Sequence, residues 1–128
     1  CLLGQWLEEY VYSTIKNLFG LDARFMGNSV AIHRQQVANE LDVVLIYNNT
    51  IYVIECKTGL NKLIFDQTAY KLNALKKEFG LHVKSAIVCL NVFKDITNLL
   101  ILFDIKLISG KDTTDKTLFE AQLKQFIK

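Results

Sequence analysis

The sequence predicts an α/β domain, a mixed β-sheet flanked by helices, on three observations. Three short apolar, strand-like segments follow one another within residues 29–57, as in an antiparallel meander. Segments in which apolar residues recur every three or four positions stand before and after this meander, as in amphipathic helices. Further strand-like segments then alternate with helical ones toward the end of the chain, which favours helix-connected strands in the same sheet.

The first predicted element is an amphipathic helix over residues 4–19, which ends at Gly20. Its apolar residues recur at helical spacing and form one stripe, as in an amphipathic helix. We expect Trp6 to lie in the core. The stripe consists of Leu3, Trp6, Leu7, Tyr10, Val11, Ile15 and Leu18.

The predicted meander consists of strands over 29–35, 40–47 and 50–57. Asn48 and Asn49 separate the last two. Asparagine tolerates the positive φ of a type I′ turn, so these residues predict a two-residue hairpin in which Tyr47 pairs with Thr50.

The remaining elements continue the alternation of helix and strand. Residues 99–103, with the sequence LLILF, fit a strand as well as a helix by composition alone. The predicted elements are a helix over 61–79 ended by Gly80, a strand over 81–90, a helix over about 95–103, a strand over 105–109 and a helix over 115–127.

Length and composition indicate one domain, residues 1–128, of a cytoplasmic protein. The chain has 51% hydrophobic and 22% charged residues and a net charge of only +2, which excludes disordered and strongly basic classes. Its apolar runs are far shorter than the roughly 20 residues of a membrane helix, so no membrane partner is expected. The chain does not begin with Met, and we expect it to be the C-terminal part of a longer protein.

The cysteines indicate a reducing environment. Cys1, Cys56 and Cys89 are odd in number and widely separated, and no Cys-x-x-Cys pair is present. The sequence therefore supports neither a disulfide framework nor a zinc site.

Charged residues at the open end of the predicted hairpin predict a site. The pairing places Asp42 opposite Glu55 and Glu40 opposite Lys57, and strand alternation puts all four on one face. Directly opposed carboxylates repel, so a cation should lie near them. Lys57 would compensate in part, and a divalent ion such as Mg²⁺ would do so better. Alternatively, Glu40 and Lys57 form an ordinary ion pair and Asp42 lies at an exposed strand end.

This pattern resembles the PD-(D/E)XK nuclease superfamily, which has the restriction-endonuclease-like fold. Asp42 matches the first acid of the motif, and Glu55-Cys56-Lys57 matches its (D/E)-x-K part. Leu41 stands in place of the proline, a position that varies in this superfamily. Gln67 and Tyr70 are similar to a Gln…Tyr element on the following helix of some members, with a spacing one residue shorter.

More narrowly, the segments GQWLEEYVY, NELDVV and IECKTG resemble the nuclease domain of CRISPR ancillary nucleases, over about residues 4–110. In those proteins a CARF sensor domain that binds cyclic oligoadenylate precedes the nuclease. The resemblance implies a homodimeric parent protein and a substrate of DNA and/or RNA, cleaved with low sequence specificity.

The resemblance also implies roles for individual residues. Asp42 and Glu55 would bind Mg²⁺ or Mn²⁺, and Lys57 would orient the attacking water or stabilise charge on the phosphate. A glutamate of the first helix would be a third metal ligand. We choose Glu8 because it lies roughly 100° from the centre of the apolar stripe, whereas Glu9 lies roughly 160° away and faces water.

Other polar residues are weaker candidates. Glu40 would support the ligands or bind a second metal, and Gln67 would hold a phosphate or a water. Tyr70 is expected to pack. Four lysines of the second helix would meet a phosphate backbone or keep the helix soluble: Lys62, Lys71, Lys76 and Lys77.

The sequence thus predicts a metal-dependent endonuclease of DNA and/or RNA. Two alternatives stay open. One is a structure-specific or restriction-type DNA endonuclease on the same fold, and the other is a catalytically inactive nucleic-acid-binding or dimerisation module.

Overall fold

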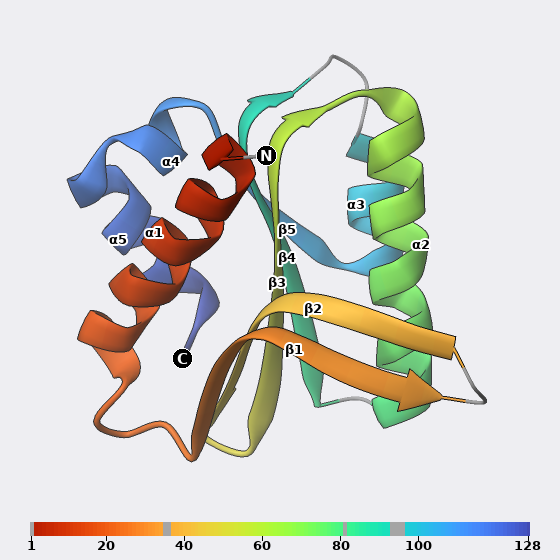
Figure 1. Cartoon of the computed structure of the whole chain (residues 1–128), viewed down its shortest axis with the longest axis horizontal. Helices are drawn as coiled ribbons and strands as arrows, with labels where there is room; N and C mark the ends of the chain where they lie inside the picture. Colours follow the sequence, from red (N-terminus) through yellow and green to blue (C-terminus); the bar gives the residue numbers. More distant parts are fainter. Residues whose placement is uncertain (1, 35–36, 81, 93–96) are drawn as a thin grey trace.

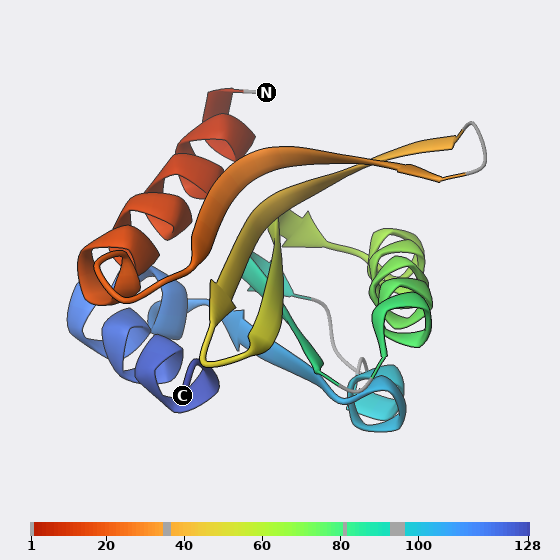
Figure 2. The ribbon, with the colours of Figure 1, turned by 90° about the horizontal axis from the view of Figure 1, so that it is seen from below.

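The computed structural model describes residues 2–34, 37–80, 82–92 and 97–128. These residues form a five-stranded sheet in the order β1-β2-β3-β4-β5, with helices on both faces. Figures 1 and 2 show α1 and α5 on one side of the sheet and α2 and α3 on the other. The predicted fold class, a mixed sheet flanked by helices, is confirmed.

The observed elements follow the predicted order. No helix of the described residues is long and apolar enough to cross a membrane. The elements are α1 (Leu2–Phe19), β1 (Phe25–Arg34), β2 (Val37–Tyr47), β3 (Thr50–Leu60), α2 (Lys62–Phe79), β4 (Val83–Val92), α3 (Thr97–Phe103), β5 (Ile105–Ser109), α4 (Lys111–Thr114) and α5 (Lys116–Phe126).

The first three strands form the predicted antiparallel meander, and β4 and β5 add parallel to β3. Tyr47 pairs with Thr50, and Asn48 and Asn49 have φ values of 50° and 61°, as a type I′ turn requires. Strand β1 begins at Phe25, earlier than predicted, because pairing with β2 overrides the turn tendency of the Gly27-containing segment. The predicted end of this strand at residue 35 lies outside the described residues.

The core has two parts, one on each face of the sheet. On the α1 side, Leu7, Val11 and Ile15 are fully buried and pack with strand residues. They are four residues apart, which gives the helix a narrow buried stripe. Trp6 lies beside this stripe and is 50% exposed, stacked on Tyr10 with 5.3 Å between ring centroids, so its predicted core position is wrong.

In the C-terminal part, the structure decides between helix and strand for the sequence LLILF. Residues 99–103 belong to helix α3, the predicted helix, and β5 has its predicted bounds. The predicted start of this helix, residues 95 and 96, lies outside the described residues. The last predicted helix, over 115–127, is α5, and it begins where the Asp115 side chain caps it by accepting a hydrogen bond from the Leu118 amide at 3.1 Å. The short helix α4 before it is not predicted.

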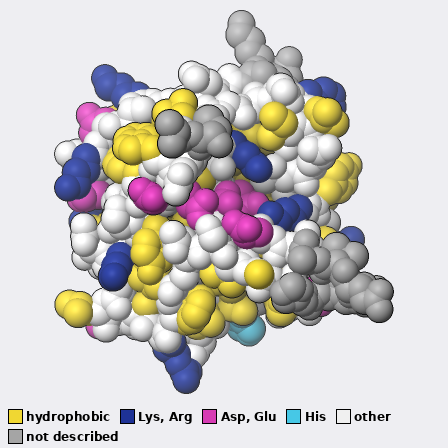
Figure 3. All heavy atoms as spheres, viewed as in Figure 1, with side chains coloured by type: hydrophobic (Ala, Val, Ile, Leu, Met, Phe, Trp, Pro, Cys, Tyr) yellow, Lys and Arg dark blue, Asp and Glu magenta, His cyan; other side chains and the backbone are white. Residues whose placement is uncertain are grey.

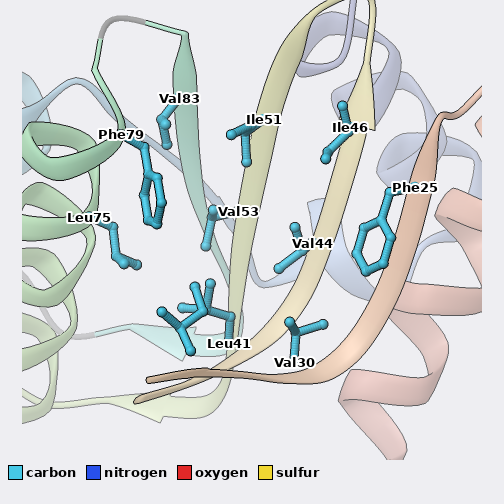
Figure 4. A pocket seen from close by; sticks show the side chains of 11 residues that line it. Phe25, Val30, Leu41, Val44, Ile46, Ile51, Val53, Leu75, Phe79 and Val83 are labelled. Carbon is cyan, nitrogen blue, oxygen red and sulfur yellow. The ribbon is translucent and has the colours of Figure 1, made fainter. Parts of the chain in front are cut away.

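The β1–β2 hairpin bends over the α2 side of the sheet and encloses an apolar hollow (Figures 2 and 4). The hollow has a volume of about 250 Å³, and none of its lining side chains is polar. A charged substrate would lose its hydration here without any compensating contact. The lining residues are Phe25, Val30, Ile32, Leu41, Val44, Ile46, Ile51, Val53, Leu75, Phe79 and Val83.

Candidate active site

Strands β2 and β3 stop pairing through their backbones where the predicted acids begin. The ladder runs from Tyr47–Thr50 to Val43–Ile54. Beyond it, the Asp42 amide donates to Glu55 Oε2 at 2.9 Å. The Cys56 amide donates to Asp42 Oδ2 at 2.8 Å. The two carboxylates therefore lie together between the strands, each held by a backbone amide near the other residue.

A local bend in β1 and β2 produces this opening. On β1, Ser29 lies between the paired residues Asn28 and Val30 and has a φ of 49°, which is rare for a residue with a side chain. On β2, Leu41 packs in the α2-side core and Val43 in the α1-side core. The strict alternation that predicts a shared face for Glu40 and Asp42 is interrupted here.

Glu55 is the buried acid of the site, with only 1% of its surface exposed. Burial, and then the nearby Asp42 carboxylate, raises the pKa of Glu55. The Asp42 amide and the Lys71 ammonium act in the opposite direction. An unpaired buried ion would cost several kcal/mol. Lys71, from α2, forms an ion pair with Glu55 Oε1 and donates to the Glu40 carbonyl at 2.6 Å.

Lys57 and Gln67 lie beside this buried acid. With Glu55 and Lys71 they line a hollow of about 340 Å³ between β3 and α2. Lys57 is half-buried and Gln67 is exposed. Lys57 lies on the same side of β3 as Glu55, as predicted, but Lys71 and not Lys57 forms the ion pair with Glu55.

Acidic side chains gather in a band across one face of the molecule, between α1 and α2 (Figure 3). Lysine or arginine side chains lie beside this band at its α2 side. The surface thus offers negative charge for a cation and positive charge for an anion at neighbouring positions.

Glu8 is the helix α1 glutamate that leans toward the sheet. Its Oε1 accepts a hydrogen bond from Ser29 Oγ at 2.6 Å, whereas Glu9 is exposed. Burial raises the pKa of the Cys56 thiol well above its ordinary value, and Asp42, Glu55 and Glu8 raise it further while Lys57 lowers it. Glu8 therefore belongs to the same electrostatic environment as the two central acids.

Within the described part of the chain, no three His, Cys, Asp or Glu side chains come together as a ready metal site. Glu8 as a third ligand stays a prediction.

The remaining candidates lie at the margins. The Glu40 side chain is exposed, and the ion pairs found among residues the structure describes do not join it to Lys57. Its backbone carbonyl, rather than its carboxylate, contacts the site through Lys71. Tyr70 is 57% exposed and makes an edge contact with Phe103.

Two residues take part in the site through contacts that the sequence does not predict. Lys71 is four residues after Gln67, so helical spacing could have placed them on one flank of α2, but it could not identify the strand that they face. Ser29 gives no signal in the sequence, because its role follows from the bend and from its contact with Glu8.

The donor set fits a hard divalent cation such as Mg²⁺ or Mn²⁺. Asp42 and Glu55 supply carboxylate oxygens, and Mg²⁺ is commonly held by one or two carboxylates with water and phosphate completing its shell. Asp42 Oδ2 accepts from an amide, while Oδ1 has no hydrogen-bond partner among the described residues. The arrangement can thus hold a cation beside Lys57, which can meet an anion.

The comparisons with known proteins identify a nuclease family. Residues 1–122 match the family model described as the Card1-like endonuclease domain. The protein VC1899 from Vibrio cholerae is 30% identical, with a TM-score of 0.81 over 97% of this chain and 35% of its own. Can2 from Sulfobacillus thermosulfidooxidans, solved with cyclic tetra-adenylate, is 26% identical, with a TM-score of 0.79 over 98% of this chain and 36% of its own.

A more distant structure shows the breadth of the fold. The small subunit of the heterodimeric restriction endonuclease R.BspD6I is 12% identical, with a TM-score of 0.57 over 94% of this chain and 69% of its own. The predicted restriction-endonuclease-like fold is confirmed. A comparison with curated proteins finds no match to this sequence. The chain spans about a third of the length of the Vibrio protein and of Can2.

Proposed function

This chain belongs to the family of Card1-like endonuclease domains, and we propose that it is a metal-dependent nuclease that hydrolyses phosphodiester bonds of DNA and/or RNA with low sequence specificity. The family match supports nuclease activity and a nucleic-acid substrate. The metal, its ligands and the breadth of the substrate are our proposal.

One observation supports the metal dependence. The carboxylates of Asp42 and Glu55 lie where the backbone hydrogen bonds between β2 and β3 would otherwise continue. Asp42 and Glu55 each accept a hydrogen bond from a backbone amide and repel one another. A protein selected for stability alone would place apolar residues or an ion pair there. Binding of a doubly charged cation would turn this repulsion into attraction.

In this mechanism Asp42 and Glu55 would hold Mg²⁺ or Mn²⁺, and Glu8 would assist from α1. When bound, the ion would supply an acidified water and neutralise charge that builds on the phosphate. Lys57 lines the hollow beside Glu55, where it would orient the attacking water or stabilise the phosphoryl oxygens. Gln67 would hold the phosphate or a water at the rim of the same hollow. Glu40 would act through its contact with Lys71.

The wider context is also a proposal. We place this domain in a longer, homodimeric and cytoplasmic CRISPR ancillary nuclease that is activated by cyclic oligoadenylate. The similarity to Can2, which was solved with cyclic tetra-adenylate, and the share of its length that this chain spans support this placement. The free thiols of Cys56 and Cys89 are consistent with a reducing compartment.

The test is cleavage of fluorescently labelled single-stranded RNA, single-stranded DNA and duplex DNA, each with Mg²⁺, Mn²⁺ or EDTA. We expect cleavage of at least one substrate with metal and none with EDTA. Glu55→Gln should abolish cleavage, whereas the matched change Glu9→Gln at an exposed position should not. If the wild-type chain cleaves none of the three in Mn²⁺, the proposal is wrong.

A further inference from the structure

We propose that Lys71 is a built-in counterion that competes with the divalent metal for Glu55, so that metal binding requires Lys71 to leave this carboxylate. The inference deepens the proposed function and rests on it, because it takes Glu55 as a metal ligand. It concerns a residue outside the Asp42, Glu55 and Lys57 motif.

The contacts of Glu55 lead to this inference. Its Oε2 accepts from the Asp42 amide and its Oε1 forms the ion pair with Lys71, so both oxygens are engaged. The Glu55 side chain is 2% exposed, against 28% for Lys71, which means that the acid is fixed inside while the ammonium comes from the edge. Of these two partners, the backbone amide cannot leave without moving β2, whereas a lysine side chain can rotate away.

Charge repulsion prevents the Lys71 ammonium and the divalent ion from binding Glu55 at the same time. An ammonium and a divalent ion on the same buried carboxylate would repel strongly, because little water separates them. Lys71 is anchored in α2 by the buried residues Thr68, Leu72 and Leu75, so its backbone stays in place when its ammonium moves.

The hollow beside Glu55 can accommodate the Lys71 ammonium once the metal displaces it. The hollow of about 340 Å³ beside Glu55 is lined by Lys71 itself, by Lys57 and by Gln67. It is the place where the proposed function puts the substrate phosphate. A second ammonium there would meet an anion, and this new charge pair would replace the one that Lys71 forms with Glu55.

Lys57 does not act as the competitor. It lines the same hollow, but it takes part in none of the ion pairs found among the described residues. The two lysines near Glu55 thus have different positions before metal arrives, and only Lys71 has to move.

The test is calorimetric titration of Mn²⁺ into metal-free wild type, Lys71→Met and Lys71→Gln, together with melting temperatures with and without Mn²⁺. We expect both variants to bind Mn²⁺ more tightly, by roughly 5- to 150-fold, the usual range for two coupled sites. Without metal their melting temperatures should fall, and saturating Mn²⁺ should raise them by more than it raises that of wild type. The glutamine variant retains groups that hydrogen-bond to Glu55 and Glu40, so it should fold even if the methionine variant does not.

Lys62→Met is the matched control. Lys62 lies on the same helix, is 79% exposed and pairs with Asp66 rather than with Glu55, so its loss should leave Mn²⁺ affinity unchanged. Unchanged or weaker Mn²⁺ binding by both Lys71 variants would overturn the inference. Tighter binding by the variants, in a chain that cleaves no nucleic acid, would uphold it and overturn the proposed function.

Discussion

The two ends of the β2–β3 hairpin are built from the same pair of strands but use their hydrogen bonds differently. At the turn end, from Tyr47–Thr50 to Val43–Ile54, backbone pairs with backbone. At the open end, the amides of Asp42 and Cys56 donate to carboxylates. The first arrangement stabilises the sheet, and the second places two negative charges side by side.

The difference shows which part of the hairpin stabilises the fold and which part lowers its stability. Leu45 and Ile54, within the backbone-paired part, are fully buried in the core. Directly after Ile54, Glu55 is buried as well, but it carries a charge and depends on Lys71 to compensate it. Sites of this kind are commonly less stable than an apolar replacement would be.

The largest expected effect is on the rate of cleavage, when a carboxylate at the open end is replaced by a neutral side chain. Asp42→Asn should lower the rate of cleavage by about 10³-fold or more, since a metal contributes several kcal/mol to transition-state stabilisation. The fold should not suffer, because the change removes a charge that repels Glu55. A fluorescent oligonucleotide assay and thermal melting measure both quantities. Asp66→Asn on α2 is the matched control and should retain activity; equal losses in the two variants would contradict the assignment.

The second expected effect comes from the turn end, where a mutation should reduce stability and leave cleavage intact. Leu45→Ala removes a fully buried side chain and should reduce the free energy of unfolding by about 2–5 kcal/mol. Urea denaturation measures this loss, and cleavage at low temperature should remain because the acids are untouched. Leu63→Ala, at a position 66% exposed, should change stability little. A large loss of activity in folded Leu45→Ala would show that the two ends are not separable.

The smallest effect is a dependence of stability on pH. The folded-state pKa of Glu55 is raised above its ordinary value of 4.5, so the folded chain binds this proton more tightly than the unfolded chain does. Stability contributed by Glu55 is therefore full below pH 4.5 and is lost as pH rises through the raised value. In metal-free protein, Glu55→Gln should gain stability relative to wild type over that interval, as measured by urea unfolding at several pH values. Glu9→Gln provides the comparison, and a difference between Glu55→Gln and wild type that does not vary with pH would contradict the assignment.

Local patterns predict most elements because their causes are local. The Asn48-Asn49 turn, the helical period of residues 61–79 and the cap of α2 by Asn61 depend on residues close in sequence. Residues 99–103 show the limit, since their composition fits strand and helix alike. They form a helix in the structure, where Leu99, Leu100 and Phe103 pack against the α2-side core.

In the candidate site, too, some features are predictable from local sequence and others are not. The type I′ turn fixes the register, and the register brings Asp42 near Glu55, so their closeness is predictable from the sequence. The partner of Glu55 is not predictable, because Lys71 belongs to a different element and only the packing of α2 against the sheet brings it there. The half-exposed position of Trp6 is missed for a similar reason, since helical spacing does not define the width of the buried stripe.

The sequence by itself determined the order of helices and strands, the hairpin register and the acids that meet at its open end, since each depends on chain direction, side-chain alternation and turn chemistry over a few residues. Only the tertiary structure decided which cation compensates Glu55, how the strands bend at Ser29 and which side chain contacts Glu8 of α1. Those features depend on contacts between elements far apart in the chain, and such contacts are set by the packing of the whole domain.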